Sequence, residues 1–273
     1  DTIFIDKFDA THDRNTATAT GAFILPNDSN PDFHTSGFLP VQLLYANISS
    51  HEFSIPLLLE PLNDSTLTSG MLNGDLSYKQ GYKLIGNLDF YDIKFRSIPP
   101  ELFNIRKLNI FAENDKIELN SYLDIGGGGW TGNTQVIINN VFNEKRHVSF
   151  SHGSDNGGTL WAEGFIDNDF IFNGTIDANG SWFIPGTVSE IKNTDLHIDM
   201  TAELKKGLKG ITADLRVDST IYEPPRTKVQ FPIYMRGHLE NGLLDINEAR
   251  TQNNSGEVIS ANLQFSLDSM KLM

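Results

Sequence analysis

The sequence predicts a nearly all-β protein, an elongated and curled antiparallel sheet with little or no helix. Apolar and polar side chains alternate with a period of two over long stretches, which is typical of strands with one apolar and one wet face. Short stretches of the form apolar-x-Gly-x-apolar recur along the 273 residues, as expected of a repetitive β-architecture. Amphipathic stretches with the helical period of 3.6 do not exceed about two turns.

The clearest repeat is a pair of similar segments at 72–78 and 84–90. They read Leu-Asn-Gly-Asp-Leu-Ser-Tyr and Leu-Ile-Gly-Asn-Leu-Asp-Phe. Alternate residues of a strand share a face, so each segment presents Leu, Gly, Leu and an aromatic side chain on one side. The polar residues 79–83 between them predict a hairpin turn. Shorter versions of the motif occur at 19–23, 172–176 and 235–239.

The first third of the chain predicts strands interrupted by loops. Residues 1–25 read as two strands around a polar run at 11–15, and the Asx- and proline-rich segment 26–32 reads as a loop. Residues 38–62 are apolar, but we expect edge strands or irregular structure there because proline cannot donate to a ladder. The prolines of that segment are Pro40, Pro56 and Pro61.

The middle of the chain predicts one helical turn, one regular strand and a boundary. Residues 99–105 could form a single turn of helix, since Pro100 suits a first helical position. The alternation over 117–125 predicts a strand that ends at the glycines 126–129. The Gly-, Ser- and Asn-rich segment 151–158 is the expected sub-boundary.

The last third shows the most regular alternation. We expect strands at 195–205, 211–218, 229–235 and 259–267, with a turn at 206–210.

A sheet of this length must shield its apolar face from water. It can pack against a second sheet, close into a barrel, or curl into a trough. The 23 glycines, many of them inside predicted strands, permit strong bending and favour the curled sheet. We expect residues 1–273 to form one elongated repetitive β-domain, a fragment of a longer protein, because the chain starts inside a predicted strand.

Composition excludes several function classes. The formal charge of −14 and the lack of a basic patch argue against nucleic-acid partners. The lack of cysteine excludes disulfides, thiolate metal sites and cysteine nucleophiles. Apolar runs stay far below the roughly 18 residues of a membrane-spanning helix, and no signal peptide is visible.

Motifs for catalysis or cofactor binding are lacking, so we expect no cofactor, no metal site and no enzymatic activity. The histidines lack a ligand spacing, although His147 and His152 flank a turn. Asx clusters at 27–32, 154–156 and 167–169 do not follow a calcium-loop pattern and read as turn formers. A carboxylate pair of the glycosidase kind stays open, because sequence cannot reveal its spacing.

The three tryptophans allow two interpretations. Trp130, Trp161 and Trp182 could form a platform on which sugar rings stack, or they could pack inside the protein. Aromatic side chains are more often used for packing, so core or interface packing is the preferred interpretation.

The motif pattern resembles the TamB/AsmA-like envelope proteins of diderm bacteria over residues 66–268. The resemblance rests on the glycine hairpin repeat and on segments 109–119, 178–182 and 253–259. It implies a β-taco, which is a long trough lined by aliphatic side chains. It also implies a periplasmic location, an inner-membrane anchor elsewhere in the protein, and a role in lipid transfer or outer-membrane protein assembly, with phospholipid cargo and a BamA/TamA-type barrel as partners. The proline-broken segment 38–62 departs from the pattern.

Two function hypotheses follow. The first is a non-enzymatic periplasmic trough that shields acyl cargo on an apolar concave face. The second is a cell-surface β-sandwich that binds glycans or a protein partner. In the first, the predicted groove residues are Leu196, Ile198, Met200, Leu204, Ile211, Leu215, Val217, Val229, Phe231, Ile233, Met235, Ile259, Leu263, Phe265 and Leu267.

Overall fold

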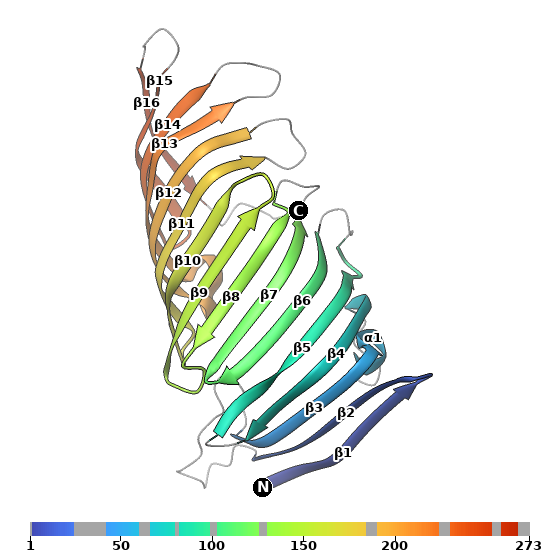
Figure 1. Ribbon diagram of the computed structural model, residues 1–273. Coiled ribbons are helices and arrows are strands. Elements are labelled where there is room, and N and C mark those ends of the chain that lie inside the picture. The colour runs from blue at the N-terminus through green and yellow to red at the C-terminus, as the bar shows by residue number, and fades with distance from the viewer. Residues whose placement is uncertain are drawn as a thin grey trace. The chain divides into compact units, whose positions relative to one another are not determined.

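The computed structural model confirms a nearly all-β fold built on antiparallel pairing (Figure 1). In the part of the chain that the structure describes, sixteen strands, β1 to β16, are hydrogen-bonded in the order of the sequence. The chain divides into two compact units, which are described separately. The structure describes residues 2–24, 42–59, 66–79, 82–98, 103–125, 130–183, 190–223, 230–252 and 258–266.

Unit 1 comprises Asp1–Asp124 and Thr134–Arg146. One short helix, α1 (Ile55–Leu59), contacts strand β4. The strands are β1 (Thr2–His12), β2 (Asn15–Ile24), β3 (Gln42–Ser54), β4 (Leu67–Lys79), β5 (Tyr82–Phe95), β6 (Phe103–Asn114), β7 (Lys116–Ile125) and β8 (Gly132–Asn139).

Unit 2 comprises Ile125–Asn133 and His147–Met273. A short 3-10 segment, η2 (Leu204–Gly210), connects two of its strands. The strands are β9 (Lys145–Ser154), β10 (Thr159–Asp167), β11 (Ile171–Phe183), β12 (Glu190–Glu203), β13 (Ile211–Glu223), β14 (Phe231–Glu240), β15 (Leu243–Gln252) and β16 (Val258–Ser266). The predicted sub-boundary 151–158 covers the end of β9 and the turn into β10.

The repeated segments 72–78 and 84–90 pair with each other as β4 and β5. Gly74 lies opposite Leu88, and Gly86 lies opposite Leu76. At Gly74 the backbone has φ +119°, and a Cβ atom would lie 2.1 Å from the Asn87 carbonyl oxygen. Glycine is therefore needed where these two strands approach each other.

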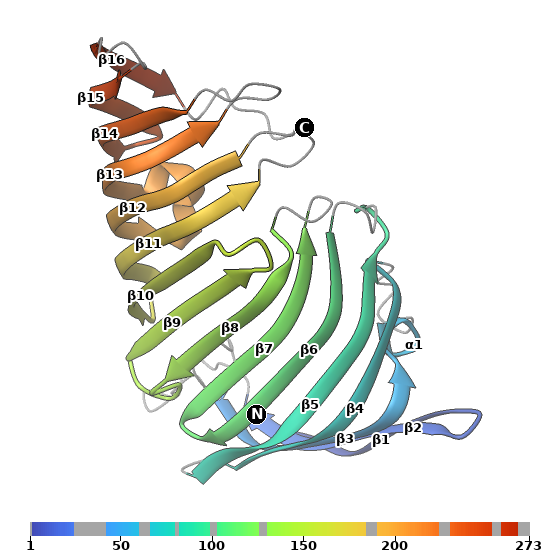
Figure 2. The ribbon, with the colours of Figure 1, turned by 45° about the horizontal axis from the view of Figure 1, so that its top comes forward.

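The strands of each unit are bent along their length (Figure 2). Shifts of register inside strands accompany the bending. In unit 1, Glu52 of β3 and Asp92 of β5 have positive φ at such shifts. In unit 2, Ser219 of β13 has φ +55° between the pairs Val217–Met235 and Thr220–Ile233. An extra residue on one strand bends it and increases its twist, so these bulges contribute to the curl.

Two predictions for unit 1 are wrong in part. Residues 42–54 form β3, an interior strand paired with both β2 and β4. Proline is absent from 42–54, so the ladder is not interrupted, and Pro56 instead lies in the first turn of α1. In the predicted helical turn at 99–105, residues 103–105 belong to β6, where Ile105 pairs with Ile93. Residues 99–102 lie outside the described part.

Most predicted strands of the last third are confirmed. Residues 195–203 lie in β12 and residues 211–218 in β13, and they pair with each other. The expected turn is the segment η2, in which Gly207 has φ +58°. The first strand ends at Glu203 and not at Lys205, because the chain leaves the ladder there and the Leu204 amide donates to the Phe170 carbonyl over 3.0 Å.

Large side chains in the described residues are seldom fully buried. Arg146 is the only large side chain that is less than 2% exposed. Unit 1 has a small core that includes Phe53, Leu72 and Leu88, and unit 2 buries Trp182 and Ile246. A single sheet layer offers each apolar side chain few partners, so most strand residues are only half-buried.

We expect the substitution Gly74→Ala to lower the free energy of unfolding by about 2 kcal/mol or more, because it adds strain at positive φ and a clash with the Asn87 carbonyl. Chemical denaturation measures this change. Gly153→Ala is the matched control, since a Cβ there meets nothing within 4 Å. Equal effects of the two substitutions would contradict the close approach of β4 and β5.

Candidate functional site

The apolar side chains of unit 2 form cross-strand rows on one face of the sheet. Directly paired residues of neighbouring strands project to the same side, so the register identifies the rows. One row contains Ala178, Leu196, Val217, Met235, Ala249 and Ala261. A second contains Ala162, Ile176, Ile198, Leu215 and Gly237. A third contains Gly164, Gly174, Met200, Ala213 and Leu239. We call these rows the apolar face.

Burial on the apolar face depends on side-chain size. Small residues such as Ala202 and Ala213 are buried, and so is Val217. On β16, Ile259 is 61% exposed and Leu263 is 43% exposed. The larger predicted groove residues of the inner strands are half-buried, namely Leu196, Ile198, Met200, Ile211, Leu215, Phe231, Ile233 and Met235.

Four further predicted groove residues are not among these half-buried side chains of the inner strands. Leu204 was expected to continue the apolar side of its strand, but it lies in η2 and is 53% exposed, because the ladder ends one residue earlier. Phe265 occupies a position of β16 opposite Leu244. Val229 and Leu267 lie outside the described residues.

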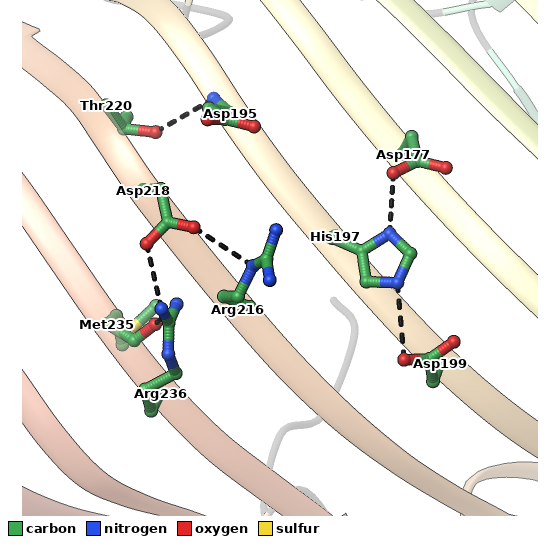
Figure 3. A network of polar contacts seen from close by, with 9 residues as sticks. All are labelled: Asp177, Asp195, His197, Asp199, Arg216, Asp218, Thr220, Met235 and Arg236. Atoms are coloured by element: carbon green, nitrogen blue, oxygen red, sulfur yellow. Dashed lines mark hydrogen bonds and ion pairs between the residues drawn. The ribbon is translucent and has the colours of Figure 1, made fainter.

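The opposite side of the same strands carries charged residues, and we call it the hydrophilic face (Figure 3). Arg216 and Arg236 are direct cross-strand partners. Like charges in this position repel, but the Asp218 carboxylate forms an ion pair with each of them. Its Oδ2 lies 2.9 Å from Arg216 Nε, and its Oδ1 lies 3.0 Å from Arg236 Nη2. Asp218 follows Arg216 by two residues, so its carboxylate projects to the same side as both guanidinium groups.

The His197 ring lies between two carboxylates on this face (Figure 3). Its Nδ1 lies 2.6 Å from Asp177 Oδ1 on β11, and its Nε2 lies 3.2 Å from Asp199 Oδ2. The hydrogen bond to Asp177 and, secondarily, that to Asp199 raise the pKa of His197 above 6.5. The alternation of residues places His197 on the polar side of its strand, but it does not reveal the partner on the next strand.

Two further histidines make cross-strand pairs with carboxylates. His238 Nδ1 lies 2.8 Å from Asp214 Oδ1, and His147 Nε2 lies 2.7 Å from Glu163 Oε1. Asp214 and Asp199 are direct partners on β13 and β12. Each of these two opposed carboxylates therefore has a histidine ring nitrogen within 3.2 Å.

The prediction that His147 and His152 flank a turn is wrong, because both lie in strand β9, and His152 is part of an aromatic cluster. His152 is 4% exposed and stacks on Trp182 with ring centroids 6.1 Å apart. Trp182 also contacts Trp130 at 4.4 Å. Burial lowers the pKa of His152. Two of the three tryptophans thus pack together, as the preferred interpretation expected, whereas Trp161 is 41% exposed.

Metal-binding geometry does not occur among the described residues, where no group of three or more His, Asp and Glu side chains could hold an ion. The Asx cluster at 167–169 is a turn, in which Asp167 Oδ1 accepts from the amides of Asp169 and Ile171. The cluster at 154–156 also forms a turn, in which the Asn156 amide donates to Ser154 Oγ. The cluster at 27–32 lies outside the described part.

The hydrophilic face of unit 2 is hollowed in two places. A hollow of about 520 Å³ is lined by residues of β12 to β15, among them His197, Asp214 and Arg236. A hollow of about 480 Å³ is lined by residues of β11 to β13, among them Asn173 and Thr201.

In comparisons with known proteins, no family model, no curated protein and no solved structure matches this chain. Among the described residues, no helix has the length and apolar character needed to cross a membrane.

His197 gives a pH-dependent contribution to stability. Because its pKa is higher in the folded state than in the unfolded chain, the folded state binds the proton more tightly. The stabilisation is fully present below pH 6.5 and is lost as pH rises through the raised pKa. We expect the difference in unfolding free energy between the protein and His197→Gln to shrink over that window.

Urea denaturation at a series of pH values measures this difference. Asp177→Asn should remove most of the dependence, since it removes the main partner of the imidazolium. A difference that stays constant over about two pH units on each side of the ordinary histidine pKa would contradict the assignment.

Proposed function

We propose that this protein is a non-enzymatic carrier that shields acyl cargo on the apolar face of unit 2. The supporting observation is the incomplete burial of large aliphatic side chains that lie in register over several strands. Side chains of a packed core lose nearly all contact with solvent. Here Ile198, Leu215 and Met235 retain exposure although their strands are interior to the sheet.

The energetics favour a long apolar ligand. Each methylene group transferred from water to such a face contributes about 0.8 kcal/mol. Cross-strand rows run perpendicular to the strands, so an extended chain can contact one residue from each successive strand. Affinity then grows with chain length and needs few polar contacts, which suits a carrier that must release its cargo.

The wider role is part of the proposal. We place the protein in the periplasm of a diderm bacterium, in lipid transport between the two membranes or in outer-membrane protein assembly. Phospholipid is the proposed cargo and a BamA/TamA-type barrel a proposed partner. The motif resemblance and the single-layer sheet support this view. The alternative is a cell-surface sandwich module that binds glycans or a protein partner.

The substitution Ile198→Asp separates an open face from a closed core. On an open face the carboxylate keeps part of its hydration, so the protein should stay soluble and unfold cooperatively with a modest loss of stability. Transfer of a fluorescent phospholipid between vesicles should fail. In a closed core the unpaired carboxylate would cost several kcal/mol and unfold a marginal protein.

Thr201→Asp is the matched control, because it adds the same charge to the same strand on the exposed hydrophilic face. It should leave transfer unchanged. An insoluble or molten Ile198→Asp protein would contradict the open-face proposal.

A photo-reactive phenylalanine analogue tests contact with cargo directly. Introduced in place of Ile198, it should cross-link to phospholipid acyl chains, because this position faces the proposed path. Introduced in place of the neighbouring Asp199, it should not, since alternate residues face opposite sides. Mass spectrometry identifies the adducts. Absence of lipid adducts at both positions, with no lipid bound to the purified protein, would remove the proposal.

A further inference from the structure

Strand β10 presents two exposed aromatic side chains on the hydrophilic face. Trp161 is 41% exposed and Phe165 is 42% exposed, both on β10. They project to the same side as His197 and Asp199, because Trp161 pairs with Asp177 and Phe165 pairs with Asn173. Single exposed aromatic side chains are common on protein surfaces, but two on one side of one strand offer a ligand two flat apolar faces.

The surroundings of the two rings are ordered by specific contacts. Glu163 lies between them on β10 and binds His147 at 2.7 Å. The His147 ring also meets the Phe165 ring edge-on, with centroids 5.2 Å apart. The Phe165 ring is therefore held in place before a ligand arrives, whereas the Trp161 indole makes no hydrogen bond or ring contact within the described part of the chain.

A polar hollow lies beside this aromatic strand. It has a volume of about 480 Å³ and includes Asn173 and Thr175 of β11. Rows of directly paired residues connect the hollow with the aromatic strand. One row runs from Phe165 through Asn173 to Thr201 and Thr212. A second row runs from Glu163 through Thr175 to Asp199. The lining of the hollow thus offers hydroxyl, amide and carboxylate groups at neighbouring positions of the sheet.

We infer that this surface, made of Trp161, Phe165 and the hollow of β11 to β13, binds a neutral oligosaccharide. A sugar ring has a face of C–H groups, which packs on the electron-rich face of an aromatic ring, and a rim of hydroxyl groups, which bind Asp, Asn and Thr. The carboxylates Glu163 and Asp199 disfavour an anionic ligand. The two ring positions lie about 13 Å apart along the strand, so a ligand that contacts both must contain several sugar units.

The aromatic surface and the proposed acyl path lie on opposite faces of the sheet. Trp161 and Ile198 project to opposite sides of the sheet, because Trp161 is in register with His197. A protein partner fits the surface less well, since the polar side chains of Glu163 and His147 separate the two rings, which do not form the apolar centre of an interface.

Isothermal titration of the purified protein with cellohexaose and with chitohexaose, two neutral hexasaccharides, tests the inference. At least one of them should bind, and its disaccharide should bind more weakly because it cannot reach both rings. Trp161→Ala and Phe165→Ala should each weaken binding by about tenfold or more, and Trp161→Phe should retain part of it.

Tyr234→Ala is the matched control, because this aromatic residue on β14 is 38% exposed and lies four strands away. It should leave binding unchanged, and thermal unfolding verifies that each variant is folded. Lack of binding to both hexasaccharides would overturn the inference, as would equal losses in Trp161→Ala and Tyr234→Ala. Neither result bears on lipid transfer, which is measured separately.

Discussion

Backbone hydrogen bonding between consecutive strands is the interaction on which this structure depends. Each strand pairs with its neighbours in sequence, and few large side chains are buried well enough to hold the sheet by hydrophobic packing. Stability therefore depends on the ladders and on cross-strand side-chain pairs, each of which contributes roughly 0.2–1 kcal/mol. The same ladders fix the register that sorts side chains between the apolar face and the hydrophilic face.

The hydrophilic face shows how a strongly acidic sheet avoids self-repulsion. Asp218 neutralises two opposed arginines, and histidines lie beside the opposed carboxylates Asp199 and Asp214. These contacts are partly exposed, so each is screened by salt and contributes little alone. Together they give each pair of opposed like charges a partner of opposite charge or a histidine beside it. Trp161 and Phe165 of β10 share that side with Tyr234 of β14 as exposed aromatic side chains.

The alternation of apolar and polar residues was sufficient to predict most strands of the last third and the face on which each side chain lies, because alternate residues of a strand project to opposite faces. It also predicted the hairpin of β4 and β5, where repeated glycines mark close backbone approach. The bulge at Ser219 and the end of β12 at Glu203 were not predictable, since both depend on which residue the next strand offers. The pair of His197 and Asp177 joins residues twenty apart in sequence, so only the register reveals it. Proline count misled the interpretation of β3, because the prolines flank that strand.

Pairing between consecutive strands also has a consequence for how such a chain assembles. The contacts that define the fold link one hairpin to the next, so each new strand needs only a short loop closure to find its template. Assembly can then spread from any hairpin in both directions, in the manner of a linear array of repeats whose stability is a sum of nearest-neighbour terms. Damage to one strand should accordingly fray its neighbours first, while distant hairpins keep their structure.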